Sequence, residues 1–195
     1  MLYSRSHLFS RQAGRALLAA AVSALALATV PAQAQAQGTG VGAGGFGTLQ
    51  AADPDKKLLD NLAEANIASI ETGKTALEKS GNPEVKKFAK QVVDDRSAAL
   101  REVERLALVK GLSVPKDADM QHKASGTALK LLTGDSFDKQ YLRNAGVDDH
   151  AQTVALLHKT QREARDPEIK ALAAKMLPTV QQQLDTAKQM TAPKK

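Results

Sequence analysis

Apolar residues recur every three or four positions through most of the chain after residue 53. Four stretches carry this spacing, at about 54–80, 83–110, 137–164 and 167–190, and the spacing is that of an amphipathic α-helix. The chain has no cysteine, so disulfide bonds cannot hold these segments together. The sequence therefore predicts an all-α domain over residues 53–191 that is stabilised by the packing of four helices.

Two similar cap signals divide this domain into hairpins. Asn82-Pro83-Glu84 and, later, Asp166-Pro167-Glu168 each place a capping side chain, a first-turn proline and an acidic residue at a helix start. Each connection is short, so each pair of helices should be antiparallel neighbours. The segment 111–136 is long enough to run back along a helix of about 40 Å, and 117–132 could hold a short helix within it. The sequence thus predicts a ferritin-like four-helix bundle, made of two hairpins joined by a long crossover.

Pro178 lies inside the last helical stretch. A proline removes one backbone donor and clashes with the carbonyl four residues earlier, which predicts a kink in this helix. A break into two helices is the alternative.

The first 34 residues have the pattern of a cleavable export signal. Three arginines precede a fifteen-residue apolar run ending at Val30, and Ala32-Gln33-Ala34 follows as a cleavage motif. The run is short for a membrane span, which needs about 20 residues. We expect cleavage after Ala34, with Ala36 as the alternative, and no transmembrane segment after the signal is removed. Residues 35–52 are rich in glycine and are predicted to form a flexible linker.

Composition excludes several classes of function. Removal of residues 1–34 takes away three arginines and no acidic residue, which lowers the formal net charge from +6 to +3. The remaining charges are of mixed sign along the chain, so a nucleic-acid partner is not expected. The sequence also lacks Trp and has few aromatic residues, which argues against an aromatic platform for sugars or bases.

Four polar residues fall on the apolar stripes, the first three near the middle of their helices and the fourth about a turn from it. They are Asn66, Arg96, His150 and Gln183. In a four-helix bundle such residues would share one polar layer across the core. This layer could fix the register of the helices, or it could hold a ligand. If the ligand is a divalent metal, the candidate ligands are Glu71, Asp95 and His150.

No complete catalytic motif accompanies these residues. Glu-x-x-His and His-x-x-x-His are both absent, and His150 and His158 lie about 12 Å apart along a helix, too far to share one metal. The ordinary ligands of a di-iron centre are therefore missing, and no other cofactor is expected.

The chain resembles an exported bacterial family, domain-of-unknown-function family four-one-four-two, whose members are also called predicted outer-membrane proteins. The matching segments run from Ala65-Asn66 to Gly73, from Asn82 to Asp95, and through Phe137-Asp138, Tyr141-Leu142, Asp149-His150, Asp166-Pro167 and Leu177-Pro178. The resemblance implies a ferritin-like bundle in the periplasm or at the outer membrane. It also implies that family members carry histidine where this chain has Arg96 and Gln183, so that only His150 keeps its imidazole.

These observations favour an exported, non-catalytic helical protein of the periplasm or cell envelope, acting by binding an unidentified envelope partner or by support, for example under stress. The alternative is a metal-binding or di-metal oxidase bundle with a degenerate centre. A third interpretation is an amphipathic adaptor at a membrane surface.

Overall fold

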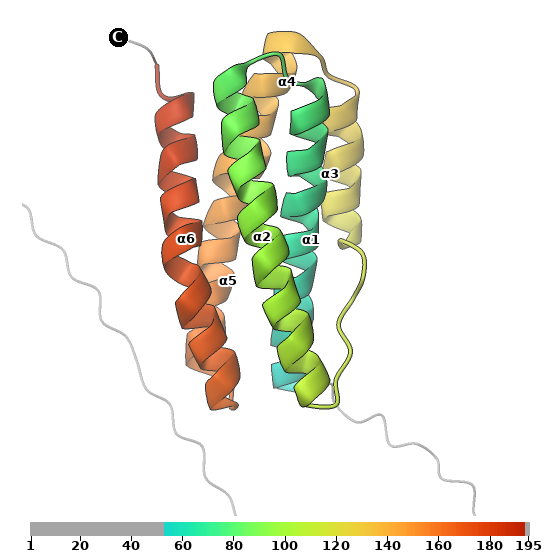
Figure 1. Cartoon of the computed structure of the whole chain (residues 1–195), viewed down its shortest axis with the longest axis vertical. Coiled ribbons are helices and arrows are strands. Elements are labelled where there is room, and N and C mark those ends of the chain that lie inside the picture. Colours follow the sequence, from blue (N-terminus) through green and yellow to red (C-terminus); the bar gives the residue numbers. More distant parts are fainter. Residues whose placement is uncertain (1–52, 194–195) are drawn as a thin grey trace, which may run out of the picture. The chain divides into compact units, whose positions relative to one another are not determined.

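The computed structural model describes residues 53–193, and all of its regular elements are helices. The predicted signal at 1–34 and the predicted linker at 35–52 lie outside the described residues. Figure 1 shows the helices standing side by side along one long axis. No helix in residues 53–193 combines the length and apolar character that crossing a membrane requires.

The first two helices form an antiparallel hairpin, as the short connection predicts. α1 spans Pro54–Lys79 and α2 spans Pro83–Val109. Each begins with a capping side chain followed by proline: the carboxylate of Asp53 accepts the N–H of Asp55, and Asn82 Oδ1 accepts the N–H of Glu84. These caps satisfy backbone donors that a helix start otherwise leaves unpaired, which places the helix boundaries.

The connection between the hairpins runs back along the bundle. α2 ends where Gly111 adopts φ of 69°, a conformation that glycine reaches without a side-chain clash. The chain then runs back beside α1 and forms α3, Met120–Lys130, which is capped by Asp119. The predicted short helix is therefore present, and it lies against α1 as an additional helix.

The third long helix differs from its prediction in its interior. α4 spans Gly134–Tyr141, a π-helical segment η1 spans Leu142–Asp148, and α5 spans Asp149–Glu163. The three follow without a break, so they form one continuous helix that starts earlier than the predicted residue 137. The π-helical turn has an extra residue per hydrogen-bonded ring, which shifts the residues after it to a new face.

The last helix, α6, spans Pro167–Thr191 and completes a second antiparallel hairpin with α5. Asp166 caps it by accepting the N–H groups of Glu168 and Ile169. The helix continues through Pro178, so the alternative of two separate helices is wrong.

Apolar side chains from both hairpins fill the space between the long helices. One cluster lies towards the end where α1 begins and includes Leu59, Leu62, Val103, Leu157 and Ile169. A second lies towards the other end and includes Val85, Phe88, Phe137, Tyr141 and Ala187. The layer of polar residues described below lies along the same helices, between these two groups.

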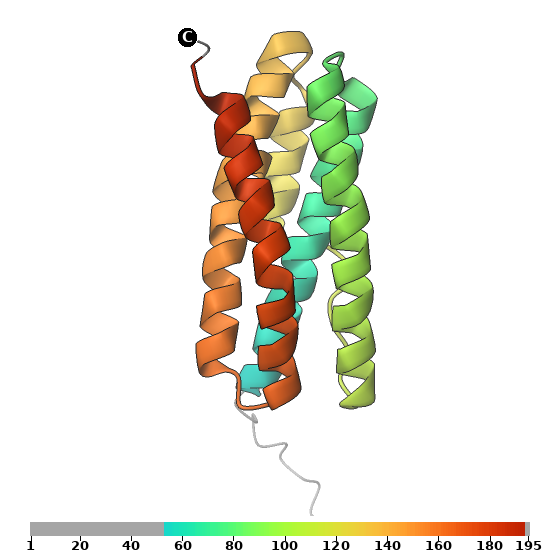
Figure 2. The same cartoon turned by 60° about the vertical axis from the view of Figure 1, so that its left-hand side comes forward.

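Polar contacts also tie one hairpin to the other. The carboxylate of Asp55, at the start of α1, accepts the backbone N–H groups of Arg165 and Asp166 at 2.8 and 2.9 Å. Lys110, at the end of α2, forms ion pairs with Asp166 and Glu168. Both contacts converge on the turn between α5 and α6, at the lower end of the bundle in Figure 2.

Candidate functional site

Four polar side chains are buried in the interior of the bundle, one from each long helix. Asn66 of α1 and Gln183 of α6 are 1% exposed, and Arg96 of α2 and His150 of α5 are 2% exposed. We call these four residues the central layer. Each lies on the inward face because it falls on the apolar period of its helix.

Arg96 and Gln183 join the two hairpins through a direct hydrogen bond. Arg96 Nη2 donates to Gln183 Oε1 at 2.9 Å, and Gln183 Nε2 donates to the half-buried Asp95 Oδ2, also at 2.9 Å. The Gln183 amide therefore links a guanidinium to a carboxylate, with each of its two ends facing the group that it can pair with. Asp95 and Arg96 also line a cavity of about 180 Å³ between α2 and α6.

Arg96 keeps its positive charge in this setting. Burial lowers its pKa to about 10, and the negative charge of Asp95 opposes that shift. At neutral pH a guanidinium with this pKa remains protonated. A full positive charge therefore occupies the middle of the bundle.

His150 is oriented by the π-helical segment that precedes it. Its Nδ1 lies 2.7 Å from the carbonyl oxygen of Ala145, five residues earlier. A carbonyl only accepts, so Nδ1 must carry the proton and Nε2 must present its lone pair. Burial and, after it, the positive charge of Arg96 lower the pKa of His150 to about 4. The imidazole is thus neutral at ordinary pH.

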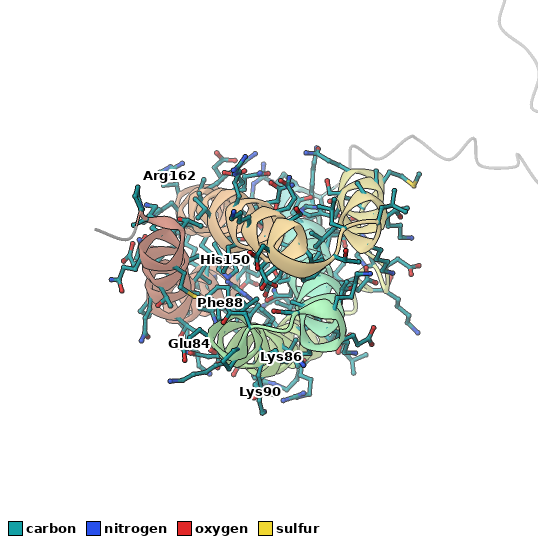
Figure 3. The ribbon with its side chains drawn as sticks, turned by 90° about the horizontal axis from the view of Figure 1, so that it is seen from above. Glu84, Lys86, Phe88, Lys90, His150 and Arg162 are labelled. Atoms are coloured by element: carbon teal, nitrogen blue, oxygen red, sulfur yellow. The ribbon has the colours of Figure 1, made fainter. Side chains whose placement is uncertain are left out.

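Figure 3 looks along the bundle and shows His150 and Phe88 inside it, while Lys90 and Arg162 point outwards. The ring centroids of Phe88 and His150 are 6.0 Å apart. An aromatic ring is therefore one of the close neighbours of the imidazole.

Three buried atoms of the central layer have no hydrogen-bond partner among the described residues. They are Asn66 Oδ1, Arg96 Nε and His150 Nε2. Asn66 uses its amide nitrogen on its own helix, donating to the carbonyl of Leu62 at 2.6 Å. The layer therefore retains one unused donor and two unused acceptors, which is unusual for groups buried this deeply.

The structure does not gather the three candidate metal ligands. Glu71 is exposed and lines a cavity of about 250 Å³ beside α3, together with His122. Glu71 directly follows Ile70, which lies four residues after Asn66 and continues the apolar spacing of α1. One residue turns a helix by about 100°, which carries Glu71 off the inward face. Within residues 53–193, no group of three or more His, Asp or Glu side chains is arranged to hold a metal ion.

A second group of ionisable residues was not predicted as a site. Glu64, Asp119, His122 and Asp149 line a cavity of about 200 Å³ between α1, α3 and α5. His122 Nδ1 lies 2.6 Å from Asp119 Oδ2. Burial, followed by neighbouring charges, raises the pKa of Glu64, and burial raises the pKa of Asp149. The local pattern Asp-x-x-His at 119–122 is the only sequence signal for this group, because its other members come from distant helices.

Solved structures with the same fold share little sequence with this chain. CopM in its Cu(II)-bound form has a TM-score of 0.60 at 19% identity and covers 70% of this chain and 95% of its own. A DUF305 fragment from Deinococcus radiodurans has a TM-score of 0.63 at 17% identity and covers 71% and 96%. A Streptomyces coelicolor DUF305 protein, described as a proposed secreted protein, has 0.60 at 14% and covers 70% and 90%.

These likenesses concern the fold, because identities below 25% do not carry a site from one protein to another. No curated protein sequence matches the chain. A family model does match, over residues 45–190, which include all the helices described above except the last residue of α6. The chain therefore belongs to the family described as "Domain of unknown function (DUF4142)".

Proposed function

We propose that this chain is an exported, non-catalytic helical-bundle protein of the periplasm or cell envelope, with a central layer that serves structure. The proposal includes a cleavable signal at 1–34, a linker at 35–52 and a ferritin-like bundle at 53–191. A supporting or binding role at the envelope, for example under stress, agrees with a fold shared by a DUF305 protein for which secretion is proposed.

The observation that supports this proposal most strongly is the position of Arg96. Its guanidinium is buried beside His150, so a cation approaching His150 Nε2 meets a fixed positive charge in a medium of low dielectric constant. Asp95, the carboxylate whose charge acts on Arg96, already accepts a hydrogen bond from Gln183. The guanidinium of Arg96 therefore supplies a fixed positive charge where a metal-binding bundle would hold its metal cation.

The second candidate function is metal binding, and His150 is the observation in its favour. Its Nε2 presents a buried lone pair with no protein partner, and the imidazole stays neutral down to a pH of about 4. CopM, which shares the fold, is known in copper-bound forms. A single neutral imidazole is a good ligand for copper or zinc, although stable sites use several ligands.

Calorimetric titration with Cu(II), Cu(I) and Zn(II), together with elemental analysis of the purified protein, separates the two candidates. We expect no stoichiometric binding that depends on His150. The matched control is His158→Ala, because His158 is an exposed histidine on the same helix. If the parent binds one equivalent of metal, and His150→Ala abolishes this binding while His158→Ala does not, the metal-binding candidate replaces our proposal.

Arg96→His tests the role of the buried charge. This substitution removes the fixed positive charge and adds a second imidazole near His150, so we expect divalent-metal affinity to rise at least about tenfold over the parent. A variant that folds, as judged by circular dichroism, and yet binds metal no better than the parent would show that Arg96 is not what excludes a cation.

A further inference from the structure

A groove near the C-terminal end of α6 has the features of a ligand site and is separate from the central layer. It lies where α6 ends, between the π-helical segment and the last turn of α6, and has a volume of about 480 Å³. This volume is within the range of about 300–1,000 Å³ that is typical of small-molecule sites. The cavity beside Arg96 is much smaller, at about 180 Å³.

The floor of the groove is apolar. Leu142 is buried, and Val147 and Met190 pack half-buried against the second apolar cluster. Hydrogen bonds in a π-helix join residues five apart, so Leu142 and Val147 lie nearly one above the other. In an α-helix they would point in different directions. The π-helical segment therefore builds a continuous apolar strip facing α6.

Two positively charged side chains lie at the edge of this apolar surface. Lys139 and Arg143 are both exposed, are four residues apart on the continuous helix, and line the groove. Neither forms an ion pair with a carboxylate in residues 53–193, whereas several other lysines of the domain do. Two free positive charges beside an apolar strip complement a molecule with an anionic head and an apolar tail.

We infer that this groove binds a free single-chain carboxylate of the fatty-acid class. The carboxylate lies between Lys139 and Arg143, and the chain lies on Leu142, Val147 and Met190. A short polar anion would leave the floor uncovered, and a neutral amphiphile would leave both cations unused. A concave groove of this size takes one molecule, which favours a free amphiphile over the flat surface of a membrane.

Calorimetric titration with decanoate, below its micelle concentration, tests the assignment. We expect one equivalent of decanoate to bind, butyrate to bind at least about a hundredfold more weakly because it lacks six methylene groups, and decyltrimethylammonium not to bind. The double variant Lys139→Gln/Arg143→Gln should weaken decanoate binding about tenfold or more. Met190→Gln, which makes the floor polar, should weaken it without changing the net charge.

The matched control removes the same charge at the opposite end of the bundle. Arg162→Gln/Lys170→Gln changes two exposed cations that are unpaired in the described residues and lie near the α5–α6 turn, so decanoate binding should be unchanged. The inference is overturned if decanoate does not bind, if the control pair weakens binding equally, or if decyltrimethylammonium binds as well. It is also overturned if only anionic vesicles bind, or if the groove variants instead abolish self-association measured by sedimentation.

Discussion

His150 brings a titratable group into the interior of the bundle, and its surroundings act on its pKa in one main direction. Burial and the charge of Arg96 both disfavour the imidazolium form, which lowers the pKa from 6.5 to about 4. The contacts with the carbonyl of Ala145 and with the side chain of Gln183 act the other way but do not offset them. The cost of protonating this histidine in the folded state must therefore appear in the pH dependence of stability.

We predict that His150 makes the protein less stable as the pH falls from about 6.5 towards 4. In this window the unfolded chain takes up a proton at His150 and the folded chain does not, so the unfolded state is favoured by up to about 3 kcal/mol. His150→Leu should remove this part of the dependence, whereas the exposed His158→Leu should keep it. Urea unfolding at pH 7.0 and 4.5 measures the difference, and equal losses for the parent and His150→Leu would contradict the prediction.

At the scale of single residues, the sequence predicts burial more reliably than it predicts hydrogen-bond partners. The helical period alone places Asn66, Arg96, His150 and Gln183 inside. The bond between Arg96 and Gln183 joins residues 87 positions apart and depends on how the two hairpins are packed. Glu71 was predicted as a metal ligand because it lies next to the apolar stripe of its helix. A residue next to the stripe points about 100° away from it, so Glu71 does not reach the interior.

Among the elements, the starts of three long helices were predictable, whereas the start of the helix that begins with α4 and its π-helical segment were not. Proline after a capping residue specifies the start of α1, α2 and α6 by local chemistry, so these boundaries agree with expectation. The residues of η1 carry no distinctive sequence pattern that would predict a π-helical turn. Within η1, Gly146 packs close to α6, because a Cβ there would be 3.0 Å from the Cβ of Ala187, and a contact of this kind becomes known only from the packed structure.

α1 and α2 are in close contact at Gly73 and Val93, which predicts that substitutions at these two residues have coupled effects on stability. A Cβ on Gly73 would lie 2.7 Å from Val93 Cγ2, so Gly73→Ala forces the helices or Val93 to move. We expect a net destabilisation of about 1 kcal/mol, because overpacking exceeds the gain in helix propensity. In Gly73→Ala/Val93→Ala the clash is relieved, and a double-mutant cycle from urea unfolding should give a coupling of at least about 1 kcal/mol. A stabilised Gly73→Ala variant would show that this contact does not limit the approach of the helices.

Over the whole molecule, the two hairpins are joined at one end by contacts with a single turn. Asp55 is only 9% exposed and accepts two backbone N–H groups from the α5–α6 turn, 110 and 111 residues away in the sequence. The sequence shows Asp55 only as an acidic residue in the first turn of α1, where it also suits the helix dipole. Its long-range role could not be inferred before the arrangement of the hairpins was known. Asp53, two residues earlier, forms only a local cap.

This pair of aspartates allows the inter-hairpin contact to be tested separately from helix capping. Asp55→Ala leaves the N–H groups of Arg165 and Asp166 without an acceptor, so we expect a loss of about 2–3 kcal/mol in urea unfolding and faster hydrogen exchange at those two amides. Asp53→Ala removes one cap, should cost about 1 kcal/mol, and should leave exchange in the α5–α6 turn unchanged. If both variants lose the same stability and neither changes exchange at Arg165 and Asp166, Asp55 acts only on its own helix, and the hairpins are held together by their apolar faces.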